Sequence, residues 1–208
     1  MKKQSYLLLT ALSFLIISCG EKAREVKNAY ELISNAPAMA ENLEKSISAA
    51  EKKREERRAK GDTLAMPYQE LQKYLPSISG YEIDGEAKGS TTNMPGMSFS
   101  SIEQIYRKDD NRVKVSLIDY NAAYTMYTAA TAIWSTGMSF EDNSQKANSV
   151  TIDGLSGWEV FKKNEKSAEL ILGVGDRFLL TITADGQENT DFVKSIAKDM
   201  ELESLAKL

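Results

Sequence analysis

The sequence predicts an α+β fold: an antiparallel sheet with the element order βββ-α-ββββ-α, helices packed on one face, and a charged helical N-terminal arm. Apolar residues alternate with polar ones in several short runs, such as Val113, Val115 and Leu117, and turn signals separate the runs. Residues 121–136 instead carry apolar residues at helical spacing. Hairpin-linked strands interrupted by single helices are typical of this architecture.

The first half of the domain is predicted to hold a short helix and three strands. Pro67 suits the first turn of a helix, which Pro76 ends. Strands follow over residues 81–92, over residues 97–108 and around Val113–Leu117. The turns between them are Asn93-Met94-Pro95-Gly96 and Asp109-Asp110-Asn111.

The central helix is predicted over residues 121–136, with Asn121 as its N-cap and Gly137 at its end. Its apolar stripe predicts one buried face, formed by Ala123, Met126, Tyr127, Ala130, Ile133 and Trp134.

Four strands and a final helix are predicted after it. Asp153-Gly154 indicates a turn, and Lys163-Asn164-Glu165-Lys166 a hairpin loop. Gly175-Asp176 predicts a type II′ turn. The last helix is expected near Asp191–Met200, with Thr190 as its cap.

The segments Thr151-Ile152-Asp153-Gly154, Gly157-Trp158-Glu159-Val160 and Gly175-Asp176-Arg177-Phe178-Leu179-Leu180 resemble small Mog1/PsbP-like α+β domains. The resemblance covers roughly residues 67–205 and implies a fold, with a hairpin-rich half and a final helix. The chain as a whole is similar to envelope lipoproteins, which implies no particular activity.

The arm is a charged helical stretch over residues 21–60, interrupted at Pro37. The mixed charges of residues 51–58 favour an exposed helix. Two interpretations remain open: a spacer that lifts the domain off a membrane, or a partner-binding or coiled-coil segment. The expected divisions are a signal peptide (1–18), the helical arm (19–64) and the α+β domain (65–208).

The N-terminus predicts export. Two lysines precede an apolar run from Leu7 to Ile17, which is too short to span a bilayer. Ile16-Ile17-Ser18-Cys19-Gly20 resembles the bacterial lipobox. That resemblance implies cleavage before Cys19, acylation of Cys19 and a membrane partner held through the lipid anchor. Gly20, in place of aspartate, favours the outer membrane if the cell is Gram-negative.

Composition excludes several kinds of chemistry. The chain has no histidine and one cysteine, Cys19, so histidine-dependent catalytic sites, cysteine clusters and intramolecular disulfides are ruled out. The formal charge is −4, and loss of residues 1–18 makes it about −6, which argues against nucleic-acid binding. We expect no cofactor and no metal. Four aspartates are candidates for acid–base or calcium chemistry: Asp119, Asp142, Asp153 and Asp176. No stretch matches a calcium loop, so structural roles are favoured for all four, and Asp153 and Asp176 each lie beside a glycine in a predicted turn.

A binding surface is the most specific functional expectation. Met94 and Met97 offer adaptable apolar contacts, and Tyr120 and Tyr124 lie off the buried helical stripe. The irregular regions 93–97 and 135–148 are expected to border this surface. The sequence thus favours a non-enzymatic binding or interaction module, with an envelope protein or a small apolar ligand as partner. The alternatives are a carboxylate-based hydrolase and a structural spacer or surface antigen.

Overall fold

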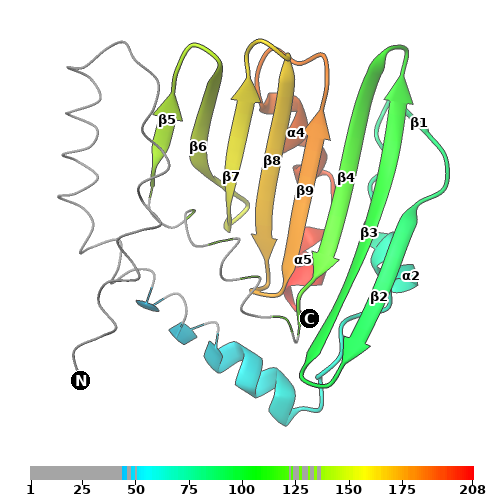
Figure 1. Cartoon of the computed structure of the whole chain (residues 1–208), viewed down its shortest axis with the longest axis vertical. Coiled ribbons are helices and arrows are strands. Elements are labelled where there is room, and N and C mark those ends of the chain that lie inside the picture. The colour runs from blue at the N-terminus through cyan, green and yellow to red at the C-terminus, as the bar shows by residue number, and fades with distance from the viewer. Residues whose placement is uncertain are drawn as a thin grey trace. The chain divides into compact units, whose positions relative to one another are not determined.

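A computed structural model describes residues 44–45, 48–49, 51–121, 123, 127, 131, 134 and 137–208, all within one compact unit, Glu41–Leu208. The unit is built on a nine-stranded sheet (Figure 1) in the order β1-β3-β4-β9-β8-β7-β6-β5, with β2 also paired to β3. Every pairing is antiparallel, which confirms the predicted α+β class and sheet type.

The first half of the sheet contains β1 (Glu82–Ile83), β2 (Lys88–Met94), β3 (Met97–Lys108) and β4 (Asn111–Asp119). The single strand predicted over residues 81–92 is therefore two strands, which pair in succession with β3. Gly85, with φ of 75°, breaks the run. The amide of Gln104 in β3 donates to the Gly85 carbonyl at 3.2 Å, so a side chain satisfies the backbone where the ladder is interrupted.

The second half contains β5 (Ser139–Glu141), β6 (Gln145–Ile152), β7 (Leu155–Lys162), β8 (Ser167–Val174) and β9 (Phe178–Ala184). The sequence did not predict β5. The type II′ prediction is wrong: Gly175 and Asp176 both have positive φ (63° and 54°), and the Arg177 N–H donates to the Val174 carbonyl. Two successive positive φ angles define a type I′ turn, whose twist matches the flanking strands.

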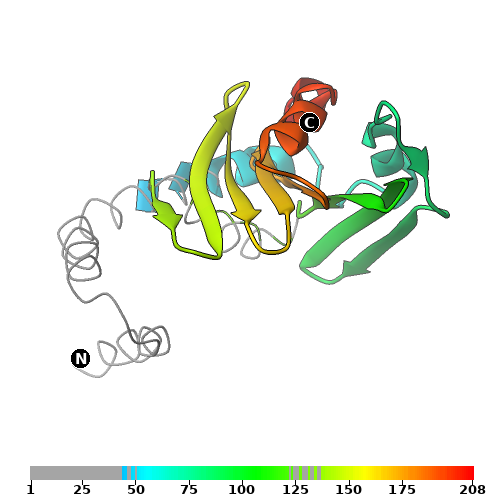
Figure 2. The ribbon, with the colours of Figure 1, turned by 90° about the horizontal axis from the view of Figure 1, so that it is seen from above.

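The core lies where alternate strand residues meet the terminal helices. Val113, Val115 and Leu117 of β4 are fully buried, as the alternation predicts. Leu202 and Leu205 of α5 (Leu202–Ala206) belong to the same apolar cluster. Figure 2 shows this helix and α4 (Asp191–Lys198) beside β8 and β9.

The short helix after Pro67 is confirmed as α2 (Tyr68–Leu71) and the 3-10 helix η1 (Gln72–Tyr74). Leu71 is fully buried. Thr190 stands at the N-cap position of α4, as predicted, but its hydroxyl makes no cap hydrogen bond. It donates to Glu159, and the Asn189 side chain accepts from the Asp191 N–H instead, at 2.8 Å.

Most of the helix predicted over residues 121–136 lies outside the described residues. Ala123, Tyr127 and Trp134 are described, and all three are buried, as the predicted stripe requires. Tyr127 and Trp134 approach β8 at Gly173, where an added Cβ would lie 2.6 Å from the Tyr127 hydroxyl and 3.1 Å from the Trp134 ring. Glycine at this position leaves room for both rings.

Candidate ligand-binding site

The end of β4 carries a buried carboxylate. Asp119 continues the inward row of Val113, Val115 and Leu117 and has no exposed surface. Arg177 binds it through two hydrogen bonds, from Nε to Oδ1 at 2.9 Å and from Nη2 to Oδ2 at 2.8 Å. The register of β4 and β9 brings the two side chains together, because Asp119 lies opposite Phe178, the residue after Arg177. The bidentate pair therefore fastens β4 to the β8–β9 loop.

We call residues 51–66 the strap. Arg177, which binds Asp119, also binds this segment. Arg177 Nη1 donates to Asp62 Oδ2 at 2.8 Å. The Asn121 amide donates to Asp62 Oδ1 at 2.7 Å and to the Leu64 carbonyl at 2.8 Å. The strap is thus bound, through charged and amide groups, to the β8–β9 loop and to the residues that follow β4, although both are far from it in sequence.

The end of the strap is fixed by its backbone. The Ala65 N–H donates to Ser98 Oγ and the Met66 N–H to Asp119 Oδ2, each at 2.7 Å. Ser100 Oγ donates in turn to the Met66 carbonyl. Both serines face inward from β3 and are buried. Their short side chains allow the strap to lie close to the strand.

The pKa values of two arginines in this region are shifted in opposite directions. Burial acts to lower the pKa of Arg177, but hydrogen bonds and attraction from Asp119 and Asp62 outweigh it, so the pKa is raised. The pKa of Arg57 is lowered, first by burial and then by repulsion from Arg177. Arg57 Nε donates to Asn121 Oδ1 at 3.3 Å, whereas its buried Nη2 finds no hydrogen-bond partner within the described ranges. The two arginines and the two aspartates balance in formal charge.

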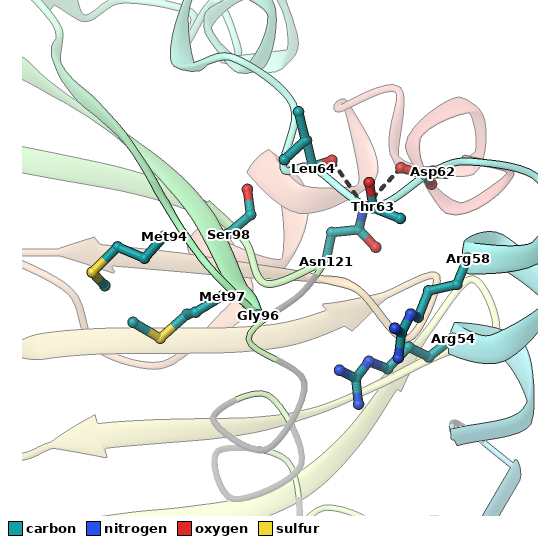
Figure 3. A pocket seen from close by; sticks show the side chains of 10 residues that line it. All are labelled: Arg54, Arg58, Asp62, Thr63, Leu64, Met94, Gly96, Met97, Ser98 and Asn121. Atoms are coloured by element: carbon teal, nitrogen blue, oxygen red, sulfur yellow. Dashed lines mark hydrogen bonds between the residues drawn. The ribbon is translucent and has the colours of Figure 1, made fainter.

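A pocket of about 280 Å³ lies between the strap and the β2–β3 turn (Figure 3). The helical part of the strap, residues 51–59, contributes Arg54 and Arg58. The β2–β3 hairpin contributes two methionines, and the close-up shows them together at the turn while the arginines extend from the helix. Its lining residues are Arg54, Arg58, Asp62, Thr63, Leu64, Met94, Gly96, Met97, Ser98 and Asn121.

The predicted binding residues separate into two groups. Met94 and Met97 lie opposite each other across the β2–β3 turn and both line the pocket. Tyr120 does not line it. It is half-buried with its ring edge-on to Tyr127, at 6.3 Å between centroids, and burial raises its pKa. Tyr124 and the lipidation residue Cys19 lie outside the described residues.

The prediction that regions 93–97 and 135–148 border one surface is wrong. Region 93–97 forms the turn between β2 and β3, near one end of the sheet, whereas β5 forms the other end. Both regions are also more regular than expected, because the pairs Met94–Met97 and Ser139–Asn148 continue their ladders. The sequence pattern does not show the order of strands across the sheet.

The other candidate aspartates lie in the turns between strands. Asp142 accepts hydrogen bonds from the Ser144 hydroxyl and from the Ser144 and Gln145 backbone, and these lower its pKa. Asp153 and Asp176 adopt positive φ in hairpin turns, and Asp176 also pairs with Lys53. Their positions in three different turns agree with the structural roles favoured from sequence, and with the turn roles predicted for Asp153 and Asp176.

No sequence pattern indicated that Arg177, Asp62 and Asn121 would form hydrogen bonds at this site. One signal was available: Asp119 continues an inward-facing apolar row, and a carboxylate in such a position needs a buried cation or several donors. Its partner could not be named, because Arg177 and Asp62 are distant in sequence and become neighbours only through the sheet.

No protein-family model, curated protein or solved structure matches this chain. Across the ranges the structure describes, no helix is long and apolar enough to cross a bilayer. The same ranges contain no cluster of three or more potential metal-binding Cys, Asp or Glu side chains.

Proposed function

We propose that the protein is a lipoprotein of the bacterial cell envelope, anchored through Cys19, whose domain is a non-enzymatic binding module. The pocket between the strap and the β2–β3 turn is its proposed ligand site. One observation carries this choice: Leu64 and Met94, which are 60% and 49% exposed, are two of the five large exposed hydrophobic residues in the described part, and both line this pocket.

The pocket combines features of a recognition site. Its apolar side comes from Leu64 and the two methionines, and methionine side chains adapt to ligands of different shape. Asn121 and Ser98 supply polar groups, and both are held by hydrogen bonds. Apolar contact beside fixed polar groups is typical of small-molecule sites, although a volume of about 280 Å³ lies just below their usual range.

The hydrolase alternative has less support. It requires two facing carboxylates, roughly 5–10 Å apart, in a cleft. Asp62 is the single carboxylate among the residues lining this pocket, and Arg177 and Asn121 hold both of its oxygens. An aspartate engaged in this way is poorly placed to exchange a proton with a substrate.

Anchoring is tested by Cys19→Ser. We expect the variant to leave the membrane fraction or to stay uncleaved, because a thiol is needed for diacylglyceryl transfer. Intact-mass analysis of the wild-type membrane fraction should show an acylated N-terminal cysteine. An unmodified Cys19 in that fraction would overturn the anchor.

Binding is tested by capture from detergent-solubilised envelopes, comparing the wild-type chain with a Met94→Ser, Met97→Ser variant. A stoichiometric partner or ligand that the variant loses supports the module. The absence of any bound species from the wild-type protein would favour the spacer or surface-antigen interpretation.

A further inference from the structure

The chain is acidic overall, yet the helical wall of the pocket is basic. Arg54 and Arg58 are four residues apart, so they lie one turn from each other on the same helix face. Like charges at this spacing repel each other weakly. Figure 3 shows both side chains extending from the helix toward the β2–β3 turn.

The charges beneath the pocket are already matched. Asp62, the acidic lining residue, is bound by Arg177 and Asn121, and Asp119 is bound by Arg177. Arg58 is exposed and forms no ion pair within the described part of the chain. Its guanidinium therefore adds a positive charge that the neighbouring carboxylates do not neutralise.

Apolar surface lies within the same pocket. Met94 and Met97 stand together at the β2–β3 turn, and Leu64 is largely exposed. An inorganic anion would leave this surface in water, whereas a neutral apolar molecule would leave the Arg58 charge unmatched. A ligand that combines the two properties uses both parts of the pocket.

We infer that the pocket binds an organic anion: a carboxylate or phosphate group held by Arg54 and Arg58, joined to a short apolar group that contacts Leu64, Met94 and Met97. This inference rests on the proposed function, because it assigns a ligand class to the same site. Guanidinium groups suit such head groups, since their planar donors match carboxylate and phosphate oxygens.

The test uses the full chain in phosphatidylcholine nanodiscs, with methionine methyl groups labelled with ¹³C. The probe is 4-phenylbutyrate, and its neutral control is 4-phenylbutyramide. Phenylbutyrate should shift the Met94 and Met97 methyl resonances in a saturable manner, and the amide should bind roughly tenfold more weakly, as expected when charge-assisted hydrogen bonds are lost.

Arg58→Gln should weaken phenylbutyrate binding about fivefold to tenfold and leave binding of the amide unchanged. Lys52→Gln is the matched control. It removes the same charge from an exposed position on the same helix and should bind like the wild type. Lys52 is two residues from Arg54, a spacing at which side chains on a helix do not face each other. Unchanged methionine resonances outside the pocket will show that both variants are folded.

The outcomes separate the two proposals. Equal binding of phenylbutyrate and its amide, or no effect of Arg58→Gln, would overturn the anion inference and leave a binding pocket. No shift of Met94 or Met97 with either probe would overturn the pocket itself. Nanodiscs that contain phosphatidylglycerol identify the source of the anion. A shift of the Met94 and Met97 methyl resonances without added probe assigns the anionic group to a lipid. No such shift assigns it to a free molecule.

Discussion

Asp119 and Arg177 form a charge pair with almost no exposed surface, 0% and 5% respectively. Removing charges from water is costly, so such a pair is stable only when its hydrogen bonds are complete. Asp119 meets this condition, because it accepts from Arg177 and from the Met66 and Asn121 N–H groups. The pair thereby fixes the relative positions of three separate chain segments.

Arg177→Leu should lower the free energy of unfolding by about 3–5 kcal/mol, because it leaves the Asp119 carboxylate buried without a cation. Urea unfolding followed by tryptophan fluorescence measures the loss. Adding Asp119→Asn should restore part of it, since the double variant buries no unpaired charge. A loss below about 1 kcal/mol for Arg177→Leu would contradict the argument.

The chain provides a control pair of the same chemistry. Arg107 binds Asp84 at 2.8 Å, the same length as the Arg177–Asp119 contact, but its two side chains are 53% and 40% exposed. Water screens such a pair, so Arg107→Leu should cost less than about 1 kcal/mol.

Strands β7 and β8 approach each other closely at Gly157. Gly157 of β7 lies opposite Leu172 of β8. A Cβ built on it would lie 2.1 Å from the Ile171 carbonyl oxygen and 2.5 Å from a Leu172 methyl group. Rotation of a side chain cannot relieve a contact with backbone. Glycine is therefore required for β7 and β8 to pair at this position.

Gly157→Ala should destabilise the domain by about 3 kcal/mol, because one strand must shift to accept the methyl group. Chemical unfolding gives the value. The neighbouring Ser156→Ala serves as the control, since Ser156 is exposed and its substitution should change stability by less than about 0.5 kcal/mol. Equal stability of the two variants would show that β7 shifts without cost.

The strap determines where the domain begins. The sequence predicts a separable arm that ends at residue 64, and residues 51–64 belong to the same compact unit, Glu41–Leu208, as the sheet. Asp62 and Leu64 bind Arg177 and Asn121, and the pocket needs the strap for one of its walls. The contacts of the strap therefore favour a domain that starts before residue 51.

A fragment of residues 65–208 should melt about 4–8 °C below a fragment of residues 41–208, which corresponds to on the order of 2 kcal/mol from lost charge-assisted hydrogen bonds. Thermal unfolding followed by circular dichroism checks this. Equal melting temperatures, together with proteolytic trimming that leaves a stable fragment from residue 65, would support the predicted boundary instead.

Sequence alone determined most strands and their hairpins, because alternation and turn residues are local properties. The alternation of apolar residues predicted the buried side of β4, and the Asp153-Gly154 dipeptide predicted the turn between β6 and β7. Local pattern also placed Met94 and Met97 at one turn, and both line the pocket. Helix α5 and strand β5 were missed, since five and three residues carry little periodic signal.

Only the tertiary structure decided the rest. The strand order separates β5 from the β2–β3 turn, although the sequence grouped their loops. It also brings Asp62, Asp119 and Arg177 together across gaps of 58 and 115 residues. Hydrogen bonds between distant residues have no fixed spacing, so sequence could indicate that Asp119 needs a partner but could not identify it. The arginine wall of the pocket arises in the same way, because the strap meets the sheet only in the folded chain.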